Sequence, residues 1–408
     1  MNKILIIGKD YYPDKLGVSK YTTEMAEWLG ENDRDVDVIT GHPYYPDWKY
    51  KGKNSSYFYV KELINNIKVF RVPLYIPAKP HGLGRSIQNI SFAIFSLPLM
   101  FYFFIIKRPF VVISLVPSYA NSFFAVILGK IFNIKTIIHV QDLEFDLAEK
   151  LNLLPAIGWK LLFQIERFTL THASLISSIS IRMLNELTAK IKVNIPTVLF
   201  PNWVDKKSIY PDRKNGNLYR SSFDISTSDF VILYSGNIGY KQGFNTIIDI
   251  AQKMKDNNKV KILIVGTGAG DKDLKNIIHK NKLKNIYHSF PVEDKMLNML
   301  LNIADLHIVL QKEGIDNYIL PSKITNIFGV GGYIFVTGSD DSEISDLVND
   351  YPGIMYIINN DELDNCINKI NKMVLNRNNH IINNVALEYA KKSLDKEKIL
   401  SDFSNYLS

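Results

Sequence analysis

The chain has 408 residues, 46% hydrophobic and 22% charged, which is the composition of a globular protein too long for one ordinary core. Its net charge of +7 favours an anionic partner. We find no dense basic stripe with interleaved aromatic residues, which argues against a nucleic-acid-binding protein. The single cysteine, Cys366, excludes a disulfide within the chain and favours a reducing compartment.

Strand-like runs alternate with helical stretches along the chain, which predicts parallel sheets covered by helices. The first run begins three residues from the N-terminus, so we predict no signal peptide. The runs of the first half are 4–7, 36–40, 69–72, 111–115, 136–140, 175–177 and 198–200. Those of the second half are 231–235, 261–265, 286–289, 306–310, 333–337 and 354–357.

This pattern predicts an α/β protein with two doubly wound, Rossmann-like domains that face each other across a cleft. We expect an N-terminal domain over residues 1–200 and a C-terminal domain over residues 229–384. Residues 201–228 have a polar composition with Pro211, Gly216 and several serines, which predicts a hinge or linker. Residues 385–408 predict a terminal helix that crosses back to the first domain.

Residues 86–106 form an uncharged run of 21 residues between Arg85 and Lys107. This length is close to the ~20 residues that span a bilayer. A span would put strands of one sheet on opposite sides of a membrane, so we predict a helix packed on the sheet. We expect its outer face to contact a membrane surface, and the alternative is a fully buried helix. The phenylalanines assigned to that outer face are Phe92, Phe95, Phe101, Phe103 and Phe104.

The loop after the first strand lacks a Gly-x-Gly-x-x-Gly turn, which argues against a nicotinamide or flavin cofactor in the first domain. It carries Gly17, Ser19 and Lys20 at a predicted helix start. Glycine would let a substrate approach the free N–H groups of that helix closely, beside a hydroxyl and a lysine. The alternative is a plain loop that contains a glycine.

Polar residues also cluster where the run 136–140 ends, with His139, Asp142, Glu144 and Asp146. Enzymes built on parallel sheets place catalytic groups at this edge. Asp142 could accept a proton from an attacking hydroxyl or stabilise a developing positive charge. The single histidine and the close spacing of the acids do not suggest a metal site. The alternative for Asp142 and Glu144 is a helix N-cap.

Three loops of the second domain predict a site for a nucleotide diphosphate. Two of them contain glycines, and the first also carries a lysine. The third is a helix start in which Pro321 fits the first turn, Ser322 fits the cap and Lys323 adds a charge. The residues of the first two loops that we select are Gly236, Asn237, Lys241, Gln242, Gly266 and Gly268.

These loops, in this order, resemble the retaining glycosyltransferase family four of GT-B fold, and within it the colanic-acid and O-antigen transferases. The resemblance covers nearly the whole chain. It rests on six blocks, which are residues 20–25 (KYTTEM), 43–48 (PYYPDW), 139–142 (HVQD), 201–205 (PNWVD), 234–243 (YSGN through KQG) and 320–326 (LPSKITN).

The resemblance implies transfer of a sugar from a UDP- or GDP-linked donor with retention at the anomeric carbon, without a cofactor or a required metal. It implies that Lys323, Asp142 and His139 are catalytic and that Gly17, Ser19, Lys20 and Glu144 bind the acceptor. Donor binding would fall to the second domain, through the six selected loop residues together with Ser322, Lys323 and Asn326. The acceptor would be a polyprenyl-diphosphate-linked saccharide of a surface polysaccharide such as capsule or O-antigen. The enzyme would then be cytoplasmic, at the inner face of the cytoplasmic membrane.

The sequence departs from this family at the donor site. The family's Glu-x7-Glu motif is not intact, because Asn326 stands at the position of its second glutamate. Asn237 and Gln242 stand where many relatives carry Arg and Lys. Two alternatives therefore stay open. One is a nucleotide-sugar epimerase on the same fold, and the other is a non-catalytic, degenerate transferase that serves as a subunit of an assembly complex.

Overall fold

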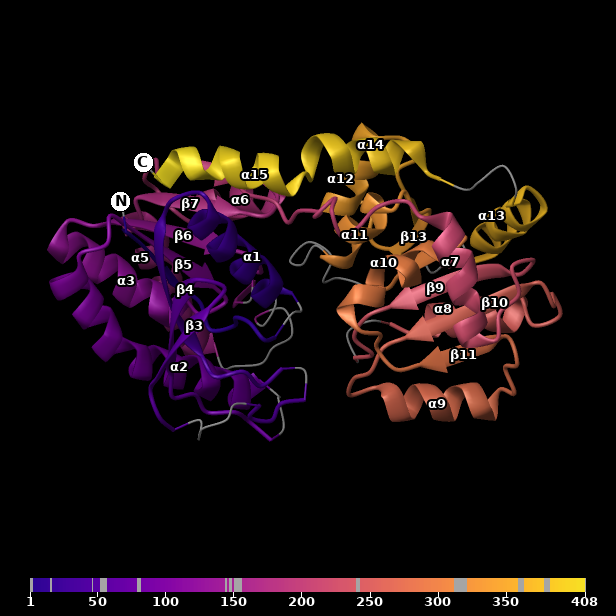
Figure 1. Ribbon diagram of the computed structural model, residues 1–408, viewed down its shortest axis with the longest axis horizontal. Coiled ribbons are helices and arrows are strands. Elements are labelled where there is room, and N and C mark those ends of the chain that lie inside the picture. Colours follow the sequence, from indigo (N-terminus) through magenta and orange to yellow (C-terminus); the bar gives the residue numbers. More distant parts are fainter. Residues whose placement is uncertain are drawn as a thin grey trace. The chain divides into compact units, whose positions relative to one another are not determined.

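The computed structural model describes residues 3–14, 17–45, 47–51, 57–78, 82–143, 145–146, 149, 156–239, 243–311, 321–358, 363–377 and 382–407. The chain divides into two compact units. Unit 1 comprises Met1–Pro201 and Leu400–Ser408, and unit 2 comprises Asn202–Ile399. Each unit contains one sheet with helices on its faces (Figure 1), which confirms the predicted α/β architecture of two Rossmann-like domains.

Unit 1 is built on an eight-stranded sheet with the strand order β3-β4-β2-β1-β5-β6-β7-β8. The order runs outward in both directions from β1 and β5, as in other doubly wound sheets. All neighbouring pairs are parallel except β3 with β4. The strands are β1 (Lys3–Ile7), β2 (Asp35–Gly41), β3 (Val60–Ile64), β4 (Ile67–Val72), β5 (Val111–Val116), β6 (Lys135–Val140), β7 (Leu175–Ser178) and β8 (Thr197–Leu199).

The edge strand β3 has no counterpart among the predicted strands. Two asparagines, Asn65 and Asn66, connect it to β4 with φ angles of 47° and 67°. Positive φ at both central residues is the requirement of a tight two-residue hairpin turn, and asparagine tolerates it. The strand alternates exposed with half-buried residues and contains Lys61 and Glu62, so it offers no apolar run. The asparagine pair was the signal that could have located it.

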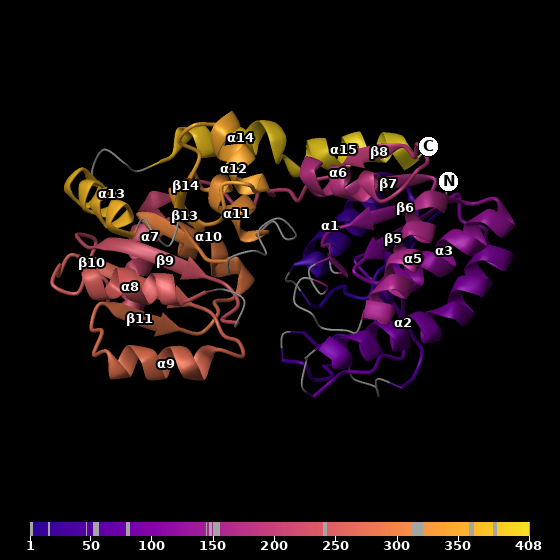
Figure 2. The same cartoon turned by 180° about the vertical axis from the view of Figure 1, so that it is seen from behind.

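Helices cover both faces of the sheet of unit 1. Right-handed crossovers place α1 on one face and α3 on the other, because the chain moves along the sheet in opposite directions through them. Helices α2, α3 and α5 lie side by side (Figure 1 and Figure 2). The helices are α1 (Val18–Glu31), α2 (Gly82–Tyr102), α3 (Tyr119–Phe132), α5 (Ala156–His172) and α6 (Ile181–Ala189), and a π-helical turn, η1 (Phe103–Lys107), continues α2.

The predicted helix at 86–106 is present as α2 and η1, but its outward face differs from the prediction. Phe92, Phe103 and Phe104 are fully buried and belong to the core between this helix and the sheet. Phe95 and Phe101 are exposed. Most residues of the segment are apolar, and two of its polar residues, Gln88 and Ser96, are themselves buried, so the sequence carries no simple periodic signal that separates the two faces.

Unit 2 is built on a six-stranded, fully parallel sheet with the strand order β11-β10-β9-β12-β13-β14. Alternate residues of its strands supply a core on each face, as expected for a sheet covered on both sides. The strands are β9 (Phe230–Ser235), β10 (Val260–Val265), β11 (Ile286–Ser289), β12 (Leu306–Val309), β13 (Ile334–Thr337) and β14 (Tyr356–Ile358).

The helices of unit 2 divide between the two faces. Helices α8 (Asn245–Lys253), α9 (Asp271–Lys280) and α13 (Leu363–Leu375) pack on one face. The single cysteine, Cys366 of α13, is buried in that core. The other face carries α10 (Leu297–Asn302), α11 (Lys323–Gly329), α12 (Glu343–Asp350) and α14 (Asn384–Ser393). The described chain also contains α15 (Lys396–Ser404) and the 3-10 turns η3 (Asp294–Met296) and η6 (Asn405–Leu407).

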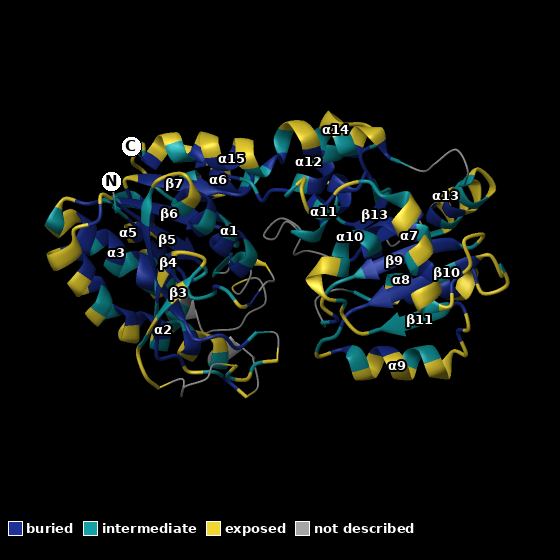
Figure 3. Ribbon diagram, viewed as in Figure 1, coloured by how far each residue is buried: buried dark blue, intermediate teal, exposed yellow. Residues whose placement is uncertain are grey.

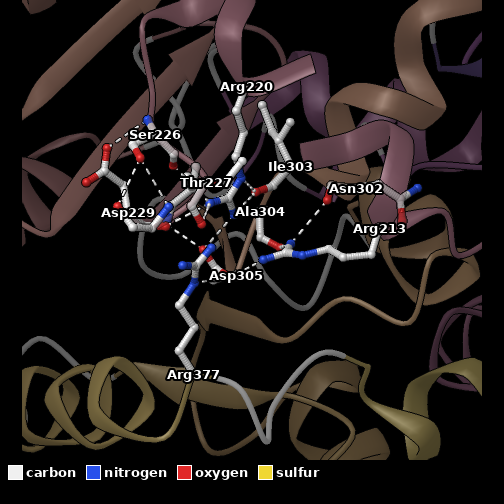
Figure 4. Close-up of polar contacts among 12 residues, drawn as sticks. Arg213, Arg220, Ser226, Thr227, Asp229, Asn302, Ile303, Ala304, Asp305 and Arg377 are labelled. Carbon is white, nitrogen blue, oxygen red and sulfur yellow. Dashed lines mark hydrogen bonds and ion pairs between the residues drawn. The ribbon is translucent and has the colours of Figure 1, made fainter. Parts of the chain in front are cut away.

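The segment 201–228, for which the sequence predicts a linker, is largely folded into unit 2. It forms α7 (Arg213–Tyr219) and a 3-10 turn, η2 (Arg220–Phe223). Arg220 is fully buried and donates to Asp305, which follows α10, at 2.8 Å. Arg213 and Arg377 also contact this carboxylate (Figure 4). A segment with a linker-like composition is therefore held in unit 2 by buried charge pairs, together with buried apolar residues such as Ile209 and Ile225.

The last residues of the chain pack within unit 1. The ring of Phe403 stacks on Phe200 with a centroid distance of 3.8 Å, and Lys135 Nζ donates to the Tyr406 carbonyl at 2.7 Å. Leu400–Ser408 therefore forms part of unit 1, although the preceding residues of α15 group with unit 2.

Candidate functional site

The candidate site lies at the carboxyl edge of the sheet of unit 2, where β9 and β10 end. Gly236 follows β9 with a φ of 145°, and Gly266 follows β10. Helix α11 starts with Lys323. A Cβ added to Gly236 would lie 2.9 Å from Lys323 Nζ, so the ammonium group sits directly against this glycine. The structure thus brings together three of the predicted loop features.

The glycines of the second loop let the two loops approach each other. A Cβ on Gly266 would lie 1.9 Å from the carbonyl oxygen of Gly236. One on Gly268 would lie 2.5 Å from Oδ1 of Asn237. The amide of Ile238 donates to the carbonyl of Thr267 at 3.0 Å, which ties the loops together. We expected these glycines to admit a ligand, and the contacts give them a role in packing loop against loop.

Lys323 is the strongest feature of the site. Its side chain is half-buried, and burial lowers the pKa of Lys323 to about 8. Its Nζ lies 4.2 Å from the centroid of the Tyr234 ring, a cation–π distance. Among the described residues, no carboxylate is paired with Lys323. A desolvated cation without an acidic partner is arranged to receive an anion from outside the chain.

The start of α11 differs from the prediction in its capping. Ser322 occupies the N-cap position, but it has helical φ and ψ angles and its side chain makes no capping hydrogen bond. The helix spans only seven residues, so its dipole contributes little. The positive charge at this position therefore comes from Lys323, and the Ser322 hydroxyl is not used to cap the helix.

Asn326 lies one turn after Lys323, and both residues line a small cavity with Ser235 and His307. The Oδ1 atom of Asn326 is buried without a hydrogen-bond partner in the described part of the chain. The Nε2 atom of His307 is also buried, and no described residue forms a hydrogen bond with it. Burial lowers the pKa of His307 to about 3, so the ring is neutral. Each of these unpaired polar atoms is unusual, because buried polar groups are nearly always hydrogen-bonded.

Two residues of this site were not selected from the sequence. Tyr234 supplies the ring beneath the Lys323 ammonium, and its hydroxyl donates to the Asn237 carbonyl at 2.7 Å. It is two residues before Gly236, so an aromatic residue at a strand end next to a glycine was the available signal. His307 lies within β12, and nothing in its sequence neighbourhood distinguishes it from a core residue.

In unit 1, His139 does not reach a ligand-accessible position. It is buried within β6, where its Nδ1 lies 3.0 Å from the Ser177 hydroxyl and its ring packs edge-on against Phe200. Burial lowers the pKa of His139 to about 3, which keeps the ring neutral. This environment is that of a core histidine, and the geometry gives no support to the predicted catalytic role.

The predicted acceptor residues of α1 contact their own neighbours. Ser19 is buried and its hydroxyl donates to the Asp14 carbonyl. Lys20 lies 4.0 Å from Glu24 and over the ring of Tyr21. Gly17 is exposed with a φ of 59°, and a Cβ placed on it would meet no atom within 4 Å. Gly17 therefore borders open space, Lys20 is partly exposed and Ser19 is buried.

Asp142 follows β6 and is half-buried. Nearby, Lys190 pairs with both Asp146 and Glu166, at 2.6 and 3.0 Å.

Glu144, Lys241 and Gln242 lie outside the described residues. Within the described ranges, no group of three His, Cys, Asp or Glu side chains has the arrangement of a metal site.

Comparison with known proteins identifies the class. The family model for "Glycosyl transferase 4-like domain" matches residues 17–203, and that for "Glycosyl transferases group 1" matches residues 217–385. The protein named WcaI of Escherichia coli (strain K12), by name a colanic acid biosynthesis glycosyl transferase, is 34% identical over 412 residues, which cover 99% of each chain.

Solved structures share the fold over the whole chain. Sucrose-phosphate synthase (tll1590) from Thermosynechococcus elongatus has a TM-score of 0.76 at 13% identity, covering 100% of this chain and 98% of its own. Anabaena Alr3699/HepE, in complex with UDP and glucose, has a TM-score of 0.70 at 12% identity, covering 100% and 99%.

The two Rossmann-like units, the two family models and the structural neighbours together define a glycosyltransferase of GT-B fold. More narrowly, the chain belongs to glycosyltransferase family four, and it resembles WcaI along its full length. The predicted family and enzyme class are thereby confirmed.

Proposed function

We propose that the chain is a retaining glycosyltransferase that moves a sugar from a UDP- or GDP-linked donor onto a lipid-linked saccharide during synthesis of a surface polysaccharide. The observation that carries the donor assignment is the half-buried Lys323 ammonium against Gly236, which has no carboxylate partner in the part of the chain that the structure describes. The acceptor we favour is a polyprenyl-diphosphate-linked saccharide at the cytoplasmic face of a membrane. The name of WcaI, which refers to colanic acid, supports a polysaccharide product.

In this reaction the bond between the anomeric carbon and the diphosphate breaks, and the departing oxygen gains negative charge. A fixed cation next to that oxygen stabilises the transition state more than the ground state. Lys323 is suited to this task because it is desolvated before the donor arrives. The buried Oδ1 of Asn326 can accept a hydrogen bond from a donor hydroxyl, and the Ser322 hydroxyl can donate to a phosphate oxygen.

Asp142 is our candidate for the acceptor side. As a half-buried carboxylate after β6, it can accept the proton of the attacking hydroxyl or stabilise positive charge at the anomeric carbon. The HepE structures hold UDP and UDP-glucose, which supports a uridine nucleotide as the first donor to test.

A thermal-shift titration with UDP, GDP and NAD tests the donor class. A nucleoside diphosphate at ~100 times its dissociation constant should stabilise the folded chain by about 2.7 kcal/mol. We expect UDP or GDP, but not NAD, to raise the unfolding midpoint, and the Lys323→Ala variant to lose most of that shift. Stabilisation by NAD alone would contradict the proposed donor, as would an equal UDP or GDP shift in the variant.

A further inference from the structure

One exposed face of α2 and η1 consists of large apolar side chains. Ile87, Ile90, Ile94, Phe101, Ile105 and Ile106, which we call the α2 face, are between 42% and 65% exposed. The spacing of three, four and seven residues keeps most of them on one side of the helix. They extend over about 28 Å along the helix axis. Figure 3 shows exposed and buried residues along α2.

The opposite side of the same helix is fixed to the sheet. Phe92, Met100 and Phe103 are fully buried in the core of unit 1. The buried Ser96 hydroxyl accepts a hydrogen bond from Asn121 Nδ2 of α3 at 2.5 Å. The helix therefore cannot turn about its axis to bury the α2 face without breaking the core.

These contacts also decide between a helix that crosses a membrane and one that lies on it. Gly84–Lys107 is the one described helix that is long and apolar enough to cross a membrane, with a mean hydropathy of 2.0. A spanning helix would have to leave the sheet and expose the core of unit 1. A helix that keeps its buried side on the sheet can present only its outer side to lipid.

The charges around the α2 face are of one sign. Arg85 at one end and Lys107 and Arg108 at the other are exposed. Residues 63–141 contain eight Lys or Arg and no Asp or Glu, so no acidic residue of this long segment opposes them. Apolar side chains flanked by basic ones suit a surface of anionic phospholipid, where the acyl boundary lies beneath a layer of phosphates.

We infer that the α2 face is a docking surface for an anionic phospholipid membrane. The apolar side chains enter the boundary between headgroups and acyl chains, and Arg85, Lys107 and Arg108 contact lipid phosphates. This inference concerns unit 1 alone and does not depend on the donor proposed for unit 2.

Vesicle cosedimentation at low ionic strength tests the surface. We expect the full chain to bind vesicles of equimolar phosphatidylcholine and phosphatidylglycerol and to bind pure phosphatidylcholine much more weakly. Lys107→Gln with Arg108→Gln should reduce binding about 25-fold, at about fivefold per charge. Ile94→Asp with Ile105→Asp should reduce it about tenfold or more, since two apolar contacts become charged.

A matched control is available in unit 2. Leu218 and Leu375 are also exposed apolar residues, and Leu218→Asp with Leu375→Asp should leave vesicle binding unchanged. The unfolding midpoints of all variants show whether they are folded, and both residues changed in the charge variant are exposed. Absence of binding by the parent chain would overturn the inference, as would equal losses in the control and the Ile94 and Ile105 variant. A concentration-dependent dimer that this variant abolishes, without vesicle binding, would assign the face to a second copy of the chain instead.

Discussion

Unit 2 contains two positively charged centres with opposite surroundings. Around Asp305, three arginines share one carboxylate, and the amide of Val231 donates to it at 2.8 Å. At the end of β9, Lys323 has an aromatic ring and a glycine beside it and no described carboxylate partner. The arginines of the first centre share a carboxylate within the chain, whereas no carboxylate partner of Lys323 lies among the described residues.

The pKa values of the two centres express this difference. Burial alone would raise the pKa of Asp305, but Arg213 and Arg220 outweigh it and hold the pKa below its usual range. Burial lowers the pKa of Lys323 to about 8, and no charge in the described chain opposes that effect. Paired buried charges are costly to break, while an unpaired buried charge lowers stability unless a ligand supplies the counter-charge.

The largest effect should come from Asp305→Ala. Three arginines would lose their shared acceptor, two of them in the segment 201–228, so the free energy of unfolding should fall by about 3–5 kcal/mol. Denaturant unfolding measures this loss. Arg377→Gln is the control, because it removes one donor and leaves the others, and it should cost about 1 kcal/mol or less. Equal losses in the two variants would mean that the cluster contributes no special stability.

Lys323→Ala should have the opposite profile, with a large effect on turnover and little effect on folding. Loss of a preorganised charge at the leaving group should reduce sugar transfer by about 10²–10³-fold. The free energy of unfolding should be unchanged or slightly higher, because an unpaired desolvated ammonium is removed. Transfer assays and denaturant unfolding on the same preparation test both parts. A folded variant with near-normal turnover would refute the placement of the diphosphate.

A smaller, graded effect should appear with pH. In the nucleotide-free chain Lys323 loses its proton above about pH 8, so affinity for a nucleoside diphosphate should fall by up to about tenfold for each further pH unit. The free chain should gain stability from this group between about pH 8 and pH 10.5, since the unfolded lysine still binds the proton there. Calorimetric titrations across this range measure the affinity.

The Lys323→Arg variant is the control for the pH effect, because a guanidinium stays protonated throughout this range. The affinity of this variant for a nucleoside diphosphate can be weaker or stronger than that of the parent chain. It should not change with pH across this range. An identical decline in both proteins would assign the titration to the nucleotide or to another residue.

Much of the fold could be predicted because the strands of both sheets are apolar runs with clear ends. The prediction of elements failed where a strand had no apolar run, and where a folded segment had the same polar composition as a linker. Strand β3 lies at an edge and contains charged residues, so no apolar run marked it. The segment around Arg220 has the polar composition of a linker, and the charge pairs with Asp305 that help to hold it in unit 2 are distant in sequence.

For the site, the sequence placed Lys323 beside the glycine loops, as the structure does, but the contacts of several other selected residues differ from those expected. Ser322 has the right residue type for a cap, yet its backbone is helical and its hydroxyl does not cap. Gly266 serves the contact between loops, which depends on a neighbouring strand and not on local sequence. His139 was selected for its position at a strand end, and tertiary packing buries it. For Gly266 and His139 the deciding contact is with a residue distant in sequence.

The buried Cys366 has a practical consequence for labelling experiments. Burial raises the pKa of its thiol to about 12, so at neutral pH almost none of it is the reactive thiolate. The parent chain should therefore resist maleimide reagents while it is folded. A cysteine introduced at Ile94 would be the one accessible thiol, and a polarity-sensitive fluorophore attached there would report directly whether this helix enters lipid.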